Sequence, residues 1–258
     1  MNRRPIVVTR AGEAGRALAD ALVDAGEDVL WLPAFELGPA PDPVQVTAVL
    51  GKLASYDLAI FVSPAAVEAT APWLKPAWPA ATAIGAVGSA TRRAVLARIA
   101  GAANATLFAP DDAAYAEGGS ESLWGVLQSS AGRMKRALIL RAEHGRQWLG
   151  EQLTTAGVEV DTLAVYTRQA CAISTEAVRR LQGWQAAQRS LALVVASSEA
   201  VDAIAGQLDP VVGPAWTRAA LALASHERIA QRLRKAGFTD VKLVMPEVEA
   251  IRKAALVR

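Results

Sequence analysis

Short polar and basic residues follow several of the predicted buried strands of this chain. Hydroxyl groups, guanidinium groups and the free N–H groups at a helix start bind carboxylates and phosphates. The residues with this placement are Thr9, Arg10, Ser63, Thr91, Arg141, Arg146, Ser197 and His226. Ligands of parallel sheets bind where the strands end, so the sequence predicts an anion site at that edge. Each serine or threonine taken singly is better explained as a helix cap, and the concentration of these residues on one edge is what favours the site.

Familiar catalytic motifs are absent from the sequence. There is no Cys-x-x-Cys, no His-Glu-x-x-His and no phosphate-binding Gly-x-x-x-x-Gly-Lys-Ser/Thr loop. The two histidines, His144 and His226, are too few for a histidine-rich metal site and give poor support to a Ser-His-Asp triad. Gly85 and Gly88 form only part of a dinucleotide fingerprint, and no acidic residue ends a second strand about twenty residues on. A nucleotide-dependent oxidoreductase is therefore not predicted.

The chain contains a partial copy of itself. Residues 10–35 align without a gap on residues 141–166, and eight of these 26 positions are identical. The two segments end on aromatic residues, Phe35 and Tyr166, of which only the tyrosine can donate a proton. An offset near half of the 258 residues indicates two similar domains, and a cleft between such domains is where a ligand is expected.

Strands and helices alternate along both halves of the sequence. Buried strands are predicted at residues 5–9, 29–32, 58–62, 82–87, 106–109, 137–140, 160–165, 191–195, 221–224 and 241–244. Helices are predicted at residues 13–25, 44–53, 65–74, 89–99, 121–130 (capped by Ser120), 146–156, 175–188, 199–207, 214–219, 227–236 and 248–256. This alternation predicts an α/β fold with parallel sheets and helices on both faces.

An even division of these elements requires the chain to cross between the two domains twice. The predicted division is residues 1–35 plus 168–258 for one domain and 38–164 for the other, with crossovers near 35–38 and 164–168. The two crossover segments would then run side by side as a hinge. The alternative is two sequential domains cut near Arg133.

Composition limits the partners and the compartment. Lysine and arginine number 27 against 25 aspartate and glutamate, and a net charge of +2 is too small to indicate a nucleic-acid partner. Hydrophobic residues at 52% and charged residues at 20% argue against disorder. The single cysteine, Cys171, cannot form an internal disulfide. No apolar run is long enough to span a membrane, and the N-terminus is unlike a signal peptide. We therefore expect a cytoplasmic protein without a membrane partner.

Short segments with a fixed order are spread over nearly the whole chain: Val8-Thr-Arg10, Phe61-Val-Ser63, Val87-Gly-Ser-Ala-Thr91, Arg141 with Gly145-Arg146, Val165-Tyr166-Thr-Arg168 and Ser197 with Ala200-Val201. In these segments the chain resembles the uroporphyrinogen-III synthase family. The resemblance implies two flavodoxin-like lobes with parallel sheets, joined by a two-segment hinge, one lobe being discontinuous.

The resemblance also implies an activity. The family is a lyase that converts hydroxymethylbilane to cyclic uroporphyrinogen III, inverting ring D and losing water, in heme biosynthesis. It needs neither a metal nor an organic cofactor. We expect the chain to act as a monomer with transient contact with hydroxymethylbilane synthase. The alternative from another functional class is a non-catalytic bilobal sensor that closes on an anionic metabolite.

The resemblance implies roles for individual residues. Tyr166 matches the family's functional tyrosine and would be the acid that assists departure of the hydroxyl; otherwise it is a hinge aromatic like Phe35. The expected contacts with the substrate carboxylates are Thr9, Arg10, Ser63, Thr91, Arg141, Arg146, Arg168 and Ser197. For the arginines, surface ion pairing is the alternative. The family's second Gly-Pro-x-Thr-Ala turn is replaced by residues 225–229, where Arg228 or His226 could bind a carboxylate instead.

Overall fold

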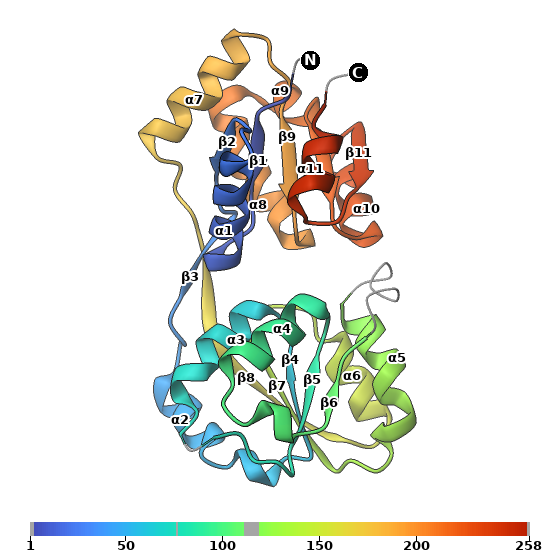
Figure 1. Ribbon diagram of the computed structural model, residues 1–258. Helices are drawn as coiled ribbons and strands as arrows, with labels where there is room; N and C mark the ends of the chain where they lie inside the picture. Colours follow the sequence, from blue (N-terminus) through green and yellow to red (C-terminus); the bar gives the residue numbers. More distant parts are fainter. Residues whose placement is uncertain (1–2, 76, 111–118, 257–258) are drawn as a thin grey trace. The chain divides into compact units, whose positions relative to one another are not determined.

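The chain forms two compact units, and its path crosses between them twice. The structure, a computed structural model, describes residues 3–75, 77–110 and 119–256. Unit 1 consists of Met1–Glu36 and Gln169–Arg258, and unit 2 consists of Leu37–Arg168 (Figure 1). The second boundary lies one residue later than the predicted one. Arg168 belongs to unit 2, as Tyr166 does, and the second segment of unit 1 begins at Gln169.

Unit 1 contains a five-stranded sheet in the order β11-β10-β9-β1-β2. The strands are β1 (Ile6–Val8), β2 (Val29–Trp31), β9 (Ala192–Val195), β10 (Leu221–Ala224) and β11 (Asp240–Leu243). All neighbouring pairs are parallel. Counted along this unit, the order is 2-1-3-4-5, which is the flavodoxin-like arrangement. The α/β fold with parallel sheets predicted from the sequence is confirmed.

Helices cover both faces of this sheet. They are α1 (Gly12–Asp24), α7 (Thr175–Ala186), α8 (Ser198–Val212), α9 (Pro214–Arg218), α10 (Glu227–Lys235) and α11 (Val248–Ala254). The three residues of β1 are fully buried because the sheet is covered on both sides. Ile6 and Val8 pack into a core with α1 and α11, whereas Val7 packs into a second core with α7, α8 and α10.

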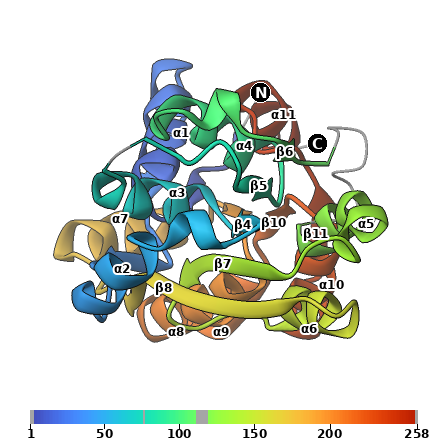
Figure 2. The same cartoon turned by 90° about the horizontal axis from the view of Figure 1, so that it is seen from below.

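Unit 2 contains a six-stranded sheet in the order β3-β8-β7-β4-β5-β6. The strands are β3 (Phe35–Gly38), β4 (Leu58–Phe61), β5 (Ala83–Ala86), β6 (Leu107–Phe108), β7 (Arg136–Ala142) and β8 (Glu159–Ala170). The pairs β8-β7, β7-β4, β4-β5 and β5-β6 are parallel, and Figure 2 shows β8, β7 and β4 side by side. If the count begins at β7, the order is again 2-1-3-4-5, with β3 added at the edge.

The duplicated segment therefore occupies the same place in both sheets. In unit 1 the copy is β1-α1-β2, and in unit 2 it is β7-α6-β8, where α6 is Trp148–Thr155. Gly26 and Gly157 follow the two helices at matched positions. Their φ angles are 82° and 85°, a region that favours glycine, so both copies end their helix by the same turn.

The remaining helices of unit 2 also cover both faces of its sheet. They are α2 (Pro43–Leu50), α3 (Pro64–Thr70), α4 (Ser89–Arg98) and α5 (Ser120–Ala131), with short 3₁₀ turns at Leu53–Ser55, Ala71–Trp73 and Ala102–Asn104. One core joins α2, α3 and α4 to the sheet, and the other joins α5 and α6 to the opposite face. The predicted cap of α5 is wrong, because Ser120 is its first residue and Gly119 precedes it.

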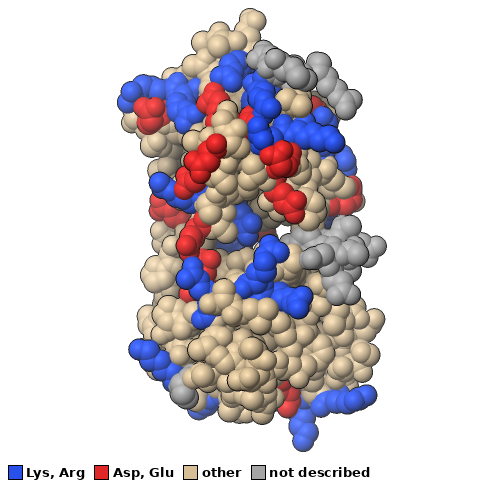
Figure 3. Space-filling view, viewed as in Figure 1, with Lys and Arg blue, Asp and Glu red and all other residues tan. Residues whose placement is uncertain are grey.

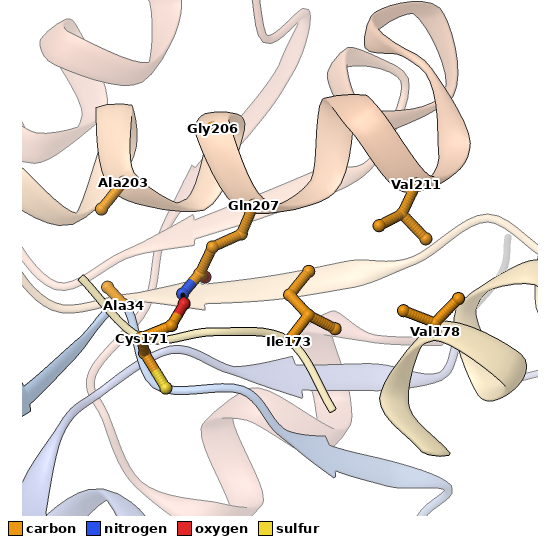
Figure 4. A pocket seen from close by; sticks show the side chains of 8 residues that line it. All are labelled: Ala34, Cys171, Ile173, Val178, Ala203, Gly206, Gln207 and Val211. Carbon is orange, nitrogen blue, oxygen red and sulfur yellow. Dashed lines mark hydrogen bonds between the residues drawn. The ribbon is translucent and has the colours of Figure 1, made fainter. Parts of the chain in front are cut away.

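An apolar groove in unit 1 lies beside both crossover segments. Its volume is about 600 Å³, and Figure 4 shows Gln207 and Ala203 reaching into it from α8. The Gln207 Nε2 donates hydrogen bonds to the carbonyl oxygens of Pro33, at 3.2 Å, and Cys171, at 2.7 Å. One amide group thus links α8 to the two chain segments that adjoin the crossovers. Within the described part of the chain, no helix has the length and apolarity that crossing a membrane requires.

Candidate active site

Each sheet contains two neighbouring strands whose chain connections lead to opposite sides of the sheet order, which is a topological switch point. In unit 1, β1 leads through α1 to β2 on one side, and β9 leads through α8 to β10 on the other. In unit 2, β7 and β4 diverge in the same way. Ligands of open α/β sheets bind beyond the carboxyl ends of the strands at such switch points. Predicted site residues flank both of them: Thr9 and Ser197 in unit 1, and Arg141 and Ser63 in unit 2.

A β-bulge directs Tyr166 toward one face of the unit 2 sheet. Leu140 pairs with Leu163 and Arg141 with Ala164, but Ala142 pairs with Tyr166, so Val165 is an extra residue. Successive strand residues face opposite sides, and a one-residue insertion reverses that alternation. Tyr166 consequently packs in the same core as Leu163 and Ala142, with α2, α3 and α4. Only 3% of Tyr166 is exposed.

The Tyr166 hydroxyl lies between a serine and an arginine. It is 3.2 Å from Ser63 Oγ, and it accepts a hydrogen bond of 3.2 Å from Arg168 Nη2. The Arg168 guanidinium also lies 5.8 Å from the centre of the Tyr166 ring. A proton donor, a hydroxyl and a cation thus meet at the carboxyl edge of the sheet.

Ser63 owes its position to the start of α3. Its Oγ accepts a hydrogen bond of 3.1 Å from the backbone N–H of Ala66, and Pro64 occupies the first turn of the helix. The cap role and the contact with Tyr166 therefore coexist, because a hydroxyl oxygen accepts two hydrogen bonds and donates one.

Arg141 is a second cation near Tyr166, in addition to Arg168. Burial lowers the pKa of Arg141, the Arg168 charge lowers it further, and Tyr166 has the opposite effect. Its Nε and Nη1 donate to the backbone oxygens of Ala142, at 3.2 Å, and Arg146, at 3.1 Å. The side chain of Arg146 instead forms a two-point ion pair with Glu121, at 2.5 and 3.2 Å. Surface ion pairing thus accounts for Arg146 but not for Arg141.

Thr91 is buried in the first turn of α4, and the residue that caps this helix is Gly88. Capping therefore does not explain Thr91. Two exposed arginines follow Thr91, Arg92 at the end of the first turn and Arg93 just after it, and the sequence-based site omits both. A cation in the first turn of a helix opposes the helix dipole, so this unfavourable placement was a signal in the sequence for a role in anion binding. In Figure 3, lysine and arginine side chains gather over the edge of unit 2 at which α3 and α4 lie.

The candidate residues of unit 1 are held mainly by backbone contacts. Thr9 is 1% exposed, and its hydroxyl donates to the carbonyl oxygen of Val194 at 2.8 Å, which joins the ends of β1 and β9. Ser197 caps α8 by accepting a hydrogen bond of 3.2 Å from the N–H of Ala200. The Arg10 carbonyl accepts from Trp31 Nε1 at 2.9 Å. The hydroxyl of Thr9 therefore donates its proton to a backbone oxygen, whereas the hydroxyl of Ser197 is an acceptor in its cap bond and can still donate its proton to a ligand.

Comparisons with known proteins agree with one another. The family model "Uroporphyrinogen-III synthase HemD" matches residues 16–251. This chain belongs to the uroporphyrinogen-III synthase family. The uroporphyrinogen-III synthase of Escherichia coli is 30% identical over 243 residues, which cover 92% of this chain and 94% of that protein.

Solved structures of the uroporphyrinogen-III synthase family share the fold. A mutant enzyme from Thermus thermophilus has a TM-score of 0.59 at 20% identity, over 98% of this chain and 96% of that one. The Helicobacter pylori enzyme has a TM-score of 0.57 at 15% identity, over 98% of each chain. At these identities the structural match concerns the fold alone.

The turn that departs from the family pattern begins α10. His226 precedes the helix without capping it through its side chain, and Arg228 is exposed in the first turn. An imidazole and a guanidinium thus lie at the carboxyl end of β10, in the turn where the resemblance implies a hydroxyl in the family. Within residues 3–75, 77–110 and 119–256, no three His, Cys, Asp or Glu side chains form a group that could hold a metal ion.

Proposed function

We propose that this protein is a uroporphyrinogen-III synthase, a cyclising lyase that converts hydroxymethylbilane to uroporphyrinogen III in heme biosynthesis. The observation that carries the proposal is the placement of Tyr166. In a chain of this family, a buried phenol lies at the switch point of a parallel sheet, 3.2 Å from Ser63 Oγ and 3.2 Å from Arg168 Nη2.

The reaction requires one proton at a leaving hydroxyl. The C–O bond of the terminal hydroxymethyl group breaks with its electron pair on oxygen, and Tyr166 supplies the proton that turns this group into water. The pyrrole nitrogen stabilises the resulting azafulvene. The substituted carbon of ring D attacks the methylene carbon of this azafulvene and forms a spiro intermediate. The bond between that ring D carbon and the methylene bridge to ring C then breaks, which leaves a second azafulvene on ring C, and the free α-carbon of ring D bonds to this bridge. The proton that this α-carbon loses when ring D regains its aromaticity returns to Tyr166. The net change is the loss of one water molecule.

The remaining polar residues serve the eight carboxylates of the substrate. In unit 2, Ser63, Thr91 and Arg141 lie at the carboxyl ends of strands, and Arg92 and Arg93 add positive charge at the same edge. In unit 1 we assign the same task to Arg10, Ser197, His226 and Arg228. Anchoring through carboxylates holds the pyrroles in one conformation, and the conformer determines which carbon of ring D reacts.

A coupled assay tests the activity directly. Hydroxymethylbilane is incubated with the protein, and the products are oxidised and separated as uroporphyrin I and III. Isomer III is expected. If only isomer I forms, as in spontaneous closure, the proposed activity is wrong. Binding of hydroxymethylbilane without isomer III would instead support a non-catalytic sensor of an anionic metabolite.

The role of Tyr166 is tested with two matched substitutions. Tyr166→Phe should lower kcat by roughly a hundredfold to ten-thousandfold, the range that a general acid contributes. Tyr56→Phe makes the same chemical change in the same unit, where the hydroxyl donates to Asp161 at 2.7 Å. The control should keep normal turnover and lose only stability. Equal activity of the two variants would remove Tyr166 from the chemistry.

We further propose that the protein acts in the cytoplasm as a monomer. A single cysteine, Cys171, suits a reducing compartment. Because free hydroxymethylbilane closes spontaneously to the wrong isomer, transient contact with hydroxymethylbilane synthase would shorten its time in solution. A change in the yield of isomer III when the synthase is replaced by added hydroxymethylbilane tests that contact.

A further inference from the structure

Resting on the proposed function, we propose that Arg168 is a positioning residue for Tyr166 and not an anchor for a substrate carboxylate. It orients the phenolic proton away from itself and stabilises the oxygen once that proton has been transferred. The surroundings of Arg168 on β8 support this assignment.

The strand places the two side chains together. Residues two apart on a strand face the same side, so Arg168 follows Tyr166 on one face of β8. The guanidinium carbon is 5.8 Å from the ring centre, and Nη2 is 3.2 Å from the hydroxyl. The bulge at Val165 sets the facing of both residues, since it precedes them.

Hydrogen-bond chemistry then determines the direction of the proton. A guanidinium only donates, so the Tyr166 oxygen is the acceptor in its bond with Arg168. The single phenolic proton must therefore point elsewhere. Among the described residues, Ser63 Oγ, at 3.2 Å, is the other hydrogen-bonding partner of the hydroxyl, and the substrate's leaving hydroxyl would replace or join it. Arg168 thus aims the proton toward the reacting group.

The same bond becomes stronger during the reaction. When Tyr166 gives up its proton, the phenolate oxygen faces a guanidinium, and hydrogen bonds between charged partners are about twice as strong as neutral ones. An interaction that strengthens only as the proton moves raises kcat without tightening substrate binding. Arg141 differs, because its Nε and Nη1 donate to backbone carbonyl oxygens.

A double-mutant cycle tests the assignment. The variants are Arg168→Met, Arg168→Lys, Tyr166→Phe and the double variant Arg168→Met with Tyr166→Phe. The control is Arg179→Met, because Arg179 lies on the surface of α7 and its side chain is 70% exposed. The measurements are kcat and KM for isomer III formation, together with circular dichroism and urea unfolding to establish that each variant is folded.

Arg168→Met should lower kcat by about tenfold to a hundredfold, the value of a charge-assisted hydrogen bond, with KM changed by less than about twofold. Arg168→Lys should recover part of the loss, because it keeps a charged donor. The double variant should be no slower than Tyr166→Phe alone, because Arg168 acts through the hydroxyl. Arg179→Met should behave as the wild type.

Two results would overturn the assignment. A raised KM with unchanged kcat in Arg168→Met would make Arg168 a carboxylate anchor, and additive losses in the double variant would show that it acts independently of Tyr166. If Tyr166→Phe forms no measurable isomer III, the double variant cannot be compared with it. The assignment then depends on Arg168→Met alone, in which a lowered kcat supports it and a raised KM with unchanged kcat overturns it. Failure of the proposed function is distinct, since the wild type would then form isomer I only.

Discussion

Replacing Gly15 by alanine should destabilise unit 1, although Gly15 lies inside a helix. Gly15 is on α1, and a Cβ atom there would lie 1.9 Å from the carbonyl oxygen of Arg10. Non-bonded carbon and oxygen atoms come no closer than about 3.3 Å. The helix or Arg10 must therefore shift by more than an ångström.

The expected magnitude is the sum of opposing contributions. Alanine is favoured over glycine in a helix by about 1 kcal/mol. Overpacking of this kind costs about 1–3 kcal/mol. A shift of Arg10 also weakens the 2.9 Å bond that its carbonyl accepts from Trp31 Nε1, a loss of about 1 kcal/mol. The net result is a loss of roughly 1–3 kcal/mol in the free energy of unfolding.

Gly183→Ala provides the matched control. Gly183 is exposed within α7 of the same unit, and a Cβ atom there would meet nothing within 4 Å. This variant should gain about 1 kcal/mol by the helix preference alone. Urea unfolding of both variants gives the two changes, which should have opposite signs. If Gly15→Ala were stabilised as much as Gly183→Ala, α1 would not be packed against the Arg10 carbonyl.

Three further outcomes are expected. Two backbone amides donate to the Asp57 carboxylate and lower its pKa. Asp57→Asn should therefore be less stable than the wild type near neutral pH. In urea titrations this difference in stability should vanish as the pH falls from about 4 through the folded-state pKa of Asp57. Burial, and to a smaller extent Glu36, raises the pKa of the Cys171 thiol, so its alkylation by iodoacetamide should be slow. Alkylation should be faster in Glu36→Gln, and an unchanged rate would contradict the contact between Glu36 and Cys171. Gln207→Leu leaves two carbonyl oxygens without their donor and should cost roughly 1–3 kcal/mol in urea unfolding, whereas an unchanged midpoint would show that water replaces the amide.

The buried strands were predictable because parallel sheets covered on both faces require unbroken apolar segments. β10 occupies the predicted residues, Leu221–Ala224, and β1 lies inside the predicted 5–9. Strand β3 was missed because it lies at a sheet edge, where its residues are only partly buried or exposed and leave no apolar pattern. The helix predicted at 199–207 extends to Val212 through Pro210, which local rules treat as a helix breaker.

Within the site, the sequence indicated residue types and strand ends but not the contacts between side chains. Ser63 could be placed after β4 by its cap pattern. Its contact with Tyr166 depends on the bulge at Val165, which no periodicity reveals, since a bulge breaks the very alternation that is being read. The ion pair of Arg146 with Glu121 joins α5 to the loop before α6, a long-range contact that sequence spacing does not encode.

The duplicated segment shows how two similar units acquire different chemistry. At the matched position of the two copies, unit 1 has Pro33 and unit 2 has Ala164. β2 ends at Trp31, at the edge of its sheet, although the backbone N–H groups of Leu32 and Ala34 still donate to the carbonyl oxygens of Val8 and Thr9. With alanine at this point, β8 continues for 12 residues in total and carries both Tyr166 and Arg168. The first copy ends on phenylalanine and lacks the hydroxyl, and Phe35 begins the separate strand β3 and does not continue β2. Of the two copies, only the one in unit 2 therefore offers a phenol for the proposed role of general acid.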